Sequence, residues 1–279
     1  MKGLPPVLIT AVVLVAGFAA CAVQFPNIAS TRVVGNLLTD NAFLGIVATG
    51  MTFVIISGGI DLSVGSVIGF TTVFVALAIE RWGVPPLIAF VAILVLSAAF
   101  GAAMGAIIHV FDLPPFIVTL GSLTAVRGVA RLLGADTTVF NSEIPYAFIG
   151  NGSLTLIPGV LSIPWLWVIA LLVILAAWLV LRRTVLGVHI YAVGGNESAA
   201  RLAGIKVWAV LIFVYGVSGL LAGLGGGMQA ARLYAANCQQ IAPGLKCAPR
   251  QDCRFVRSGR VKHRAIHGIE QQPDALQLQ

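Results

Sequence analysis

Charged side chains are scarce in this sequence. Of its 279 residues only 10% are Asp, Glu, Lys or Arg, where about 25% is usual in soluble proteins. Hydrophobic residues make up 58%, and the mean hydropathy is +0.98. A soluble chain of this length could not cover its surface with so few charges. The composition therefore excludes an ordinary soluble domain and indicates a membrane protein.

Several enzyme motifs are also absent. The chain has no Gly-Lys-Ser/Thr loop for nucleotide phosphates, no His-Glu-x-x-His zinc motif and no Gly-x-Ser-x-Gly nucleophile motif. The glycine run 225–227 lies inside an apolar segment with no strand before it, which is not the context of a nucleotide loop. These absences predict that the chain is not an enzyme and binds no cofactor of its own.

Cysteines are few and concentrated near the C-terminus. Cys21 is the only one among residues 1–236, so no disulfide framework is predicted there. The other three lie in the segment 237–279, where seven basic residues face three acidic ones. One interpretation of this segment is a zinc site with the ligands Cys247, Cys253, His263 and His267. Because Cys-x5-Cys is wider than the usual cysteine pair, we prefer an unstructured tail without a metal.

Long uncharged runs dominate the rest of the chain. About 20 apolar residues are needed to cross about 30 Å of hydrocarbon. None of the runs alternates with period two, which disfavours a β-barrel. The sequence therefore predicts an all-α integral membrane protein, a polytopic bundle of about seven transmembrane segments. These segments lie within 3–31, 41–60, 62–79, 82–111, 113–134, 144–181 and 207–231.

The connection 182–206 sets the predicted orientation. It carries four basic residues against Glu197 alone, and basic loops favour the cytoplasmic side. Alternating seven spans then places the N-terminus in the cytoplasm too. Within this connection, Gly194-Gly195-Asn196 predicts a turn, followed by a short helix from Glu197 to Leu202 with Asn196 as its cap and Gly204 as its stop. Such a helix is either a docking element or a plain connector.

A polar stretch interrupts the apolar runs at residues 58–66. The adjacent Gly58 and Gly59 let the backbone leave helical geometry. Asp61, followed by Ser63, is expected to cap the next helix. The stretch is either a tight turn between helices or a polar break in a transport pathway, and one set of residues can serve both.

Two arginines lie inside the segment 113–134. Arg127 and Arg131 are four residues apart and share a helix face with Thr124. An arginine at the bilayer centre usually faces a bundle interior or an aqueous path, whereas one near the end of a span snorkels to the interface. Snorkelling is preferred for Arg131, and both interpretations stay open for Arg127.

Small residues at four-residue spacing allow helices to approach closely. Packing within the chain is preferred here over a dimer contact. The residues are Gly101 with Gly105, and Gly219, Gly223 and Gly227.

Several segments together resemble the permease subunits of bacterial sugar ABC importers of the ribose, galactoside and arabinose type. The resemblance covers about residues 5–236. Gln24–Pro26, Ala29–Val33 and Leu38–Asn41 are most similar to the galactofuranose permease branch. The matching segments, in the family's order, are Asn41–Phe43, Gly58–Ser66, Pro115–Gly121, Arg127–Gly128, Ile190–Asn196 and Ala199–Ile205.

The resemblance implies a multi-pass subunit of the bacterial inner membrane that moves a monosaccharide by alternating access. Its partners would be a second permease subunit (identical or different), a periplasmic sugar-binding protein and a cytoplasmic ABC ATPase that uses the ATP; nucleic acid is not among them. The candidate residues of the substrate pathway are Asn41, Asp61, Ser63 and Arg127. Those of the ATPase coupling loop are Gly187, Tyr191, Gly194, Gly195, Asn196, Arg201 and Gly204.

The C-terminal segment departs from that family. After Asn237 the family continues with further membrane spans, whereas this chain becomes the basic tail. We therefore expect an incomplete permease domain, residues 1–236, and an aberrant tail, residues 237–279, that a shifted reading frame would explain. The alternatives are a truncated permease that does not transport, a self-sufficient secondary transporter or channel, and a membrane scaffold.

Overall fold

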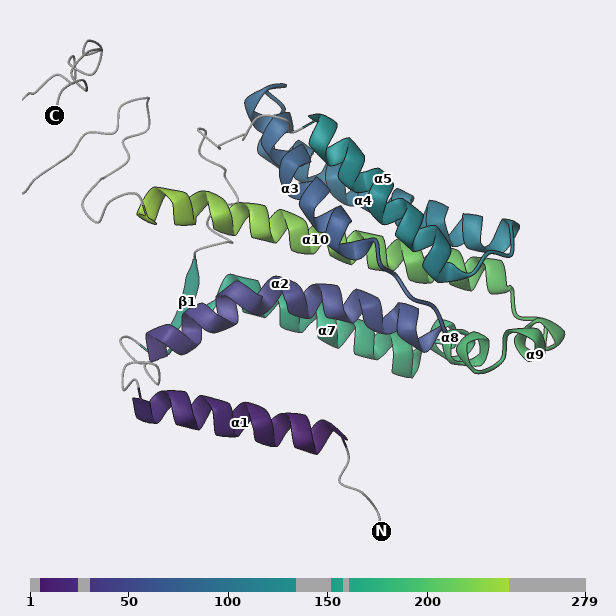
Figure 1. Ribbon diagram of the computed structural model, residues 1–279, viewed down its shortest axis with the longest axis horizontal. Coiled ribbons are helices and arrows are strands. Elements are labelled where there is room, and N and C mark those ends of the chain that lie inside the picture. The colour runs from purple at the N-terminus through teal and green to yellow at the C-terminus, as the bar shows by residue number, and fades with distance from the viewer. Residues whose placement is uncertain (1–5, 25–30, 134–151, 158–160, 241–279) are drawn as a thin grey trace, which may run out of the picture. The chain divides into compact units, whose positions relative to one another are not determined.

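Helices make up almost all of the described chain. The computed structural model describes residues 6–24, 31–133, 152–157 and 161–240 (Figure 1). The chain divides into two compact units, residues 1–235 and 236–279, and the contacts reported below lie within the first. The elements are α1 (Pro6–Gln24), α2 (Thr31–Ile56), α3 (Val64–Glu80), α4 (Pro86–Val110), α5 (Pro115–Leu133), β1 (Ser153–Ile157), β2 (Leu161–Pro164), α7 (Trp165–Arg183), α8 (Val185–Gly195), α9 (Glu197–Leu202) and α10 (Val207–Gln240).

The predicted helical membrane protein is confirmed. Within the described residues, five helices are long and apolar enough to cross a membrane: α2 from Gly35, α4, α5, α7, and α10 up to Arg232. The other two predicted segments form the apolar helices α1, which has 19 residues, and α3, which has 17. Large apolar side chains on the spans face outward, as Leu132 does with 84% of its surface exposed. Lipid accommodates such a surface, whereas water does not.

Some boundaries differ from the prediction. The run 144–181 holds more than a span, because β1 and β2 form an antiparallel hairpin with Ser153 opposite Pro164 before α7 begins. Helix α2 begins at Thr31, ten residues before the predicted run. It accommodates Asp40 through an ion pair with Arg232 of α10, at 2.8 Å.

The C-terminal prediction falls largely outside the described residues. Helix α10 continues to Gln240, four residues into the segment 237–279 that was assigned to an unstructured tail. Residues 241–279, and with them the zinc interpretation, lie outside the described part of the chain.

Glycines let three helices pack closely on α10. Gly219 lies against Gly101 of α4, since a Cβ on Gly101 would come within 3.2 Å of the Gly219 Cα atom. Farther along, Gly225 faces α2, Gly226 faces α3 and Gly227 faces α4. The small residues at four-residue spacing thus serve packing within the chain, as predicted. The run 225–227 is helical.

Candidate functional site

The polar break between α2 and α3 is the first candidate site. After Ile56, the Ser57 N–H donates to the carbonyl oxygen of Phe53 (3.1 Å), and Gly58 turns the chain with a φ of +83°. Glycine favours that conformation because it has no Cβ. Helix α3 begins only at Val64, so residues 57–63 form a non-helical link.

The Asp61 carboxylate ties this link to α10. Its Oδ1 atom accepts hydrogen bonds from the N–H (2.9 Å) and the hydroxyl (2.6 Å) of Ser63, and its Oδ2 atom accepts one from the Ser218 hydroxyl (2.8 Å). The expectation that Asp61 caps α3 is wrong. Ser63 is the N-cap residue, and its side chain makes no capping bond. Asp61 lies two residues before this N-cap. Its carboxylate bonds to the cap residue and not to a backbone N–H of α3.

The α10 side of the break lies near the middle of a candidate membrane span. Ser218 is eleven residues beyond Val207, the start of the α10 span. At about 1.5 Å per residue it lies about 16 Å along the helix axis, which is roughly half of a hydrocarbon layer about 30 Å thick. A polar, non-helical backbone at this depth must be buried in protein or line a wet cavity. Asp61, Ser63 and Ser218 are buried, at 3%, 1% and 1% exposure.

Two further side chains close around the link. Tyr215 of α10 is fully buried, and a Cβ on Gly59 would lie 2.5 Å from its hydroxyl oxygen. From α5, the Thr119 hydroxyl lies 3.3 Å from the Ile60 carbonyl oxygen and shares its proton with carbonyls of its own first turn. The link is therefore contacted by both α5 and α10.

Asn41 and Arg127 lie away from this link. Asn41 is exposed on α2, where its Nδ2 atom donates to the carbonyl one turn earlier (2.7 Å). Arg127 is exposed on α5, as is Arg131. Within the described chain, no hydrogen bond or ion pair joins Asn41 or Arg127 to the link. Of the four pathway candidates, the structure brings only Asp61 and Ser63 together.

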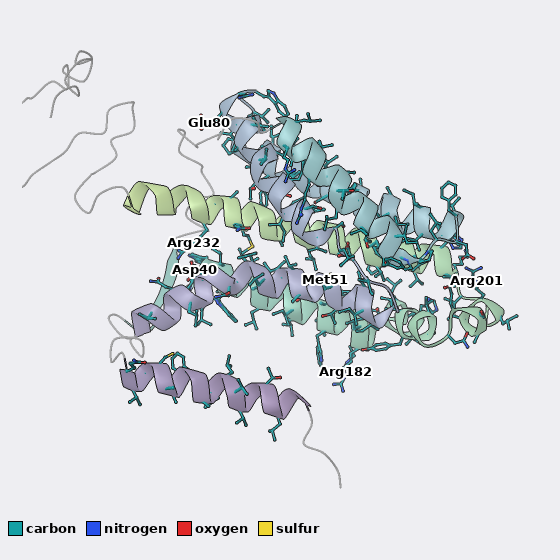
Figure 2. The ribbon with its side chains drawn as sticks, in the orientation of Figure 1. Asp40, Met51, Glu80, Arg182, Arg201 and Arg232 are labelled. Carbon is teal, nitrogen blue, oxygen red and sulfur yellow. The ribbon has the colours of Figure 1, made fainter. Side chains whose placement is uncertain are left out.

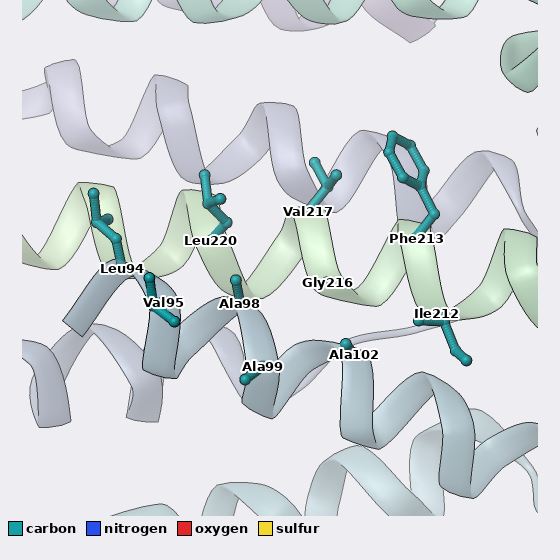
Figure 3. Close-up of a pocket in the computed structure, with 10 residues that line it drawn as sticks. All are labelled: Leu94, Val95, Ala98, Ala99, Ala102, Ile212, Phe213, Gly216, Val217 and Leu220. Atoms are coloured by element: carbon teal, nitrogen blue, oxygen red, sulfur yellow. The ribbon is translucent and has the colours of Figure 1, made fainter. Parts of the chain in front are cut away.

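A large apolar groove between α4 and α10 is not a sugar site (Figure 3). Its volume is about 510 Å³, and no polar side chain lines it. Such a surface has nothing to orient the hydroxyl groups of a sugar. The lining residues are Leu94, Val95, Ala98, Ala99, Ala102, Ile212, Phe213, Gly216, Val217 and Leu220.

The segment after α7 is the second candidate site. The predicted helix Glu197–Leu202 is confirmed as α9, and the Asn196 Oδ1 atom accepts a hydrogen bond from the Ala199 N–H (3.0 Å). Gly204 follows with a φ of +81°. The turn before α9 is shorter than predicted, because Gly195 still belongs to α8.

Two glycines of α8 fit it tightly against its neighbours. A Cβ on Gly194 would overlap the carbonyl oxygen of Ile56 and come within 3.1 Å of the Ser57 carbonyl carbon. A Cβ on Gly187 would overlap the carbonyl oxygen of Leu181 in α7. The end of α8 therefore rests on the end of α2, directly before the polar link.

The other five coupling-loop candidates are exposed. On the surface of α9, Arg201 forms an ion pair with Glu197 (2.6 Å). Both of these side chains are about half exposed. Three apolar residues that are not among the predicted site residues are exposed beside them: Val185 (69%), Val188 (66%) and Leu202 (91%). The three-residue spacing of Val185, Val188 and Tyr191 would have revealed one apolar face of α8. The exposed candidates are Tyr191, Gly195, Asn196, Arg201 and Gly204, and Gly194 is exposed as well on the side away from Ile56.

The cap of α9 can be tested separately. Asn196→Ala removes the acceptor for the Ala199 N–H, and we expect α9 to lose about 1 kcal/mol of stability. Hydrogen exchange of the α9 amides should speed up by about fivefold as a result. Ser198→Ala, an exposed position of the same helix, is the control. Equal exchange rates in the two variants would contradict the role of the cap.

Comparison with known proteins identifies the family. Residues 33–249 match the family described as "Branched-chain amino acid transport system / permease component". The chain belongs to this permease family. It is thus a multi-pass membrane protein of the ABC-transporter permease type.

Similar proteins are permeases by name. The chain is 45% identical over 221 residues to the inner membrane ABC transporter permease protein YjfF of Escherichia coli K12, a match that covers 79% of the chain and 66% of YjfF. It is 40% identical to the ribose import permease RbsC of the same organism (76% of the chain, 65% of RbsC). It is 35% identical to the fructose import permease FruG of Bifidobacterium longum (73% and 59%). The chain thus spans less than two thirds of the length of each of these relatives. No solved structure matches it.

Proposed function

We propose that this chain is a permease subunit of a sugar ABC importer in the bacterial inner membrane. The observation that carries the proposal is the contact of Gly194, in the exposed α8–α9 segment, with Ile56 and Ser57, where α2 ends and the polar link begins. A permease has no ATPase site of its own. It therefore needs a surface that binds the partner ATPase, and contacts that link this surface to the interior of the helix bundle. The family match and the sugar-import relatives support the same conclusion.

The proposed docking surface faces the cytoplasm. Helices α8 and α9 expose Val188, Tyr191 and Leu202 next to polar groups, the pattern of a helix that docks in an apolar groove. The four basic residues of 182–206 favour the cytoplasmic side, which also places the N-terminus there. The partner on this surface is an ABC ATPase, and its ATP supplies the energy.

Movement of this surface would reach the membrane interior in two contacts. Gly194 presses on the end of α2, and the chain continues from there to Asp61, which is bonded to Ser218 of α10. Packed backbone contacts are stiff, because close-packed interiors transmit displacement with little compression. A shift of α8 would therefore change the position of the link relative to α10, and alternating access would follow from such shifts.

The remaining partners follow from the same proposal. A periplasmic sugar-binding protein delivers the cargo at the opposite face, and a second permease subunit completes the pathway. The exposed face of α5 with Arg127 suits contact with that subunit or the aqueous path, because an arginine facing lipid is costly. The cargo is a monosaccharide. The resemblance of residues 24–41 favours galactofuranose, while the named relatives import ribose and fructose.

Docking is tested by changing the most exposed apolar residue. In Leu202→Ser, co-purification of the cognate ABC ATPase with the chain in detergent should fall at least tenfold, because burying a leucine contributes about 1.5–3 kcal/mol. Leu87→Ser is the matched control, since Leu87 is also exposed (69%) but belongs to the first turn of α4. ATPase binding that is equally strong in both variants would overturn the docking surface. Uptake driven by an ion gradient, with the purified chain alone, would favour a secondary transporter.

A further inference from the structure

A small polar pocket lies where α2, α7 and α10 meet, far from the proposed docking surface. Its volume is about 120 Å³. It lies near the start of α2 and the end of the α10 span, whereas α8 and α9 lie at the other ends of both helices. Figure 2 shows Asp40 and Arg232 together at this place and Arg201 at the other end. The lining residues are Thr39, Asp40, Phe43, Leu166, Gln229 and Arg232.

Two polar groups of this pocket, Asp40 and Gln229, leave hydrogen-bonding capacity unused among the described residues. The Nε and Nη2 atoms of Arg232 both donate to the Oδ1 atom of Asp40, at 3.0 and 2.8 Å. The Oδ2 atom of Asp40 accepts no hydrogen bond from the described residues, and the Asp40 side chain is 59% exposed. Gln229 adds an amide with both donor and acceptor atoms. Phe43 and Leu166 supply an apolar wall.

This combination matches the chemistry of a sugar. Neighbouring hydroxyl groups both donate and accept, so a carboxylate and an amide can bind them together. The C–H groups of the ring pack on an aromatic side chain. The pocket is small, at about 120 Å³. It can therefore take the hydroxyl-bearing edge of one sugar ring, but not a whole disaccharide.

We propose that this pocket is a sugar-binding subsite at the entrance of the pathway. The inference rests on the proposed function, because the orientation given there places this end of the helices on the periplasmic side. Asp40 and Gln229 would hold two neighbouring hydroxyl groups, while Arg232 fixes the Asp40 carboxylate. A purely structural ion pair between α2 and α10 would not need Gln229.

Saturation-transfer NMR on the full chain in nanodiscs tests the subsite. D-ribose, D-fructose and D-galactose are the probes, each at millimolar concentration, and L-leucine is the non-sugar comparison. We expect transfer to at least one of the sugars and none to leucine. The signal should fall at least fivefold in Gln229→Leu, which leaves the ion pair intact, and in Asp40→Asn. Gln24→Leu, the same change on exposed α1, should keep it.

The outcomes separate this inference from the proposed function. No transfer to any of the three sugars, an unchanged signal in Gln229→Leu, or transfer to leucine alone would overturn the subsite. ATPase co-purification is measured on the same preparations. A chain that binds the ATPase but no sugar would refute only the subsite, whereas a chain that binds sugar but no ATPase would refute the importer.

Discussion

Gly194→Ala is expected to separate ATP hydrolysis from transport. The added Cβ would overlap the backbone carbonyl oxygen of Ile56, which cannot rotate away as the end of a side chain can. Either α8 or the end of α2 must then move. Overpacking of this kind typically costs about 1–3 kcal/mol. It would also displace the contact through which a movement of α8 reaches the polar link.

The measurement combines stability with coupling. We expect the thermal unfolding midpoint of the chain in detergent to fall by several degrees. In the reconstituted complex, ATP hydrolysis should continue while sugar uptake per ATP falls at least tenfold. Gly195→Ala is the matched stability control, because a Cβ one residue later meets no atom within 4 Å. If Gly194→Ala matched Gly195→Ala in stability and kept normal uptake per ATP, the contact with Ile56 would have no part in coupling.

The sequence predicted those features that depend on neighbouring residues. Apolar run lengths located the helices, and the order Asn196, Glu197 and Gly204 located α9 with its cap and stop. Both follow from hydrogen bonding and side-chain spacing within a few residues. The packing role of the glycines on α4 and α10 was also accessible, because small residues at four-residue spacing have few other uses in a membrane helix.

The long-range contacts could not be predicted in this way. Ser218 lies 157 positions from Asp61, and nothing in the sequence around Ser218 marks it as the partner of a carboxylate. Asp40 and Arg232 are 192 positions apart and meet only because α2 and α10 pack side by side. The error about the Asp61 cap has the same origin. A local rule assigned the carboxylate to the next helix, while a distant hydroxyl and the cap residue itself provide its partners.

Asp61→Ala is expected to destabilise the bundle more than any other single change considered above. The substitution removes three hydrogen bonds at membrane depth and leaves the Ser63 and Ser218 hydroxyls without their acceptor. Hydrogen bonds to a charged group contribute about 1.5–3 kcal/mol each, and an unsatisfied buried group costs about 1–3 kcal/mol. We expect a total loss of about 3–5 kcal/mol, measured by reversible denaturation in mixed micelles.

A double-mutant cycle with Ser218→Ala shows how much of this destabilisation comes from the hydrogen bond between Asp61 and Ser218. Ser218→Ala alone should cost about 1–2 kcal/mol. In the Asp61→Ala background it should cost almost nothing, because its acceptor is already gone, so the coupling energy should exceed about 1 kcal/mol. Ser97→Ala is the matched control, since among the described residues the buried Ser97 hydroxyl bonds only to the carbonyl of Leu94 in its own helix (3.1 Å). Ser97→Ala should lower the free energy of unfolding by the same small amount whether or not Asp61 is present. Strictly additive losses for Asp61 and Ser218 would show that their hydrogen bond does not hold the polar link to α10, and the path from Gly194 inward would end at α2.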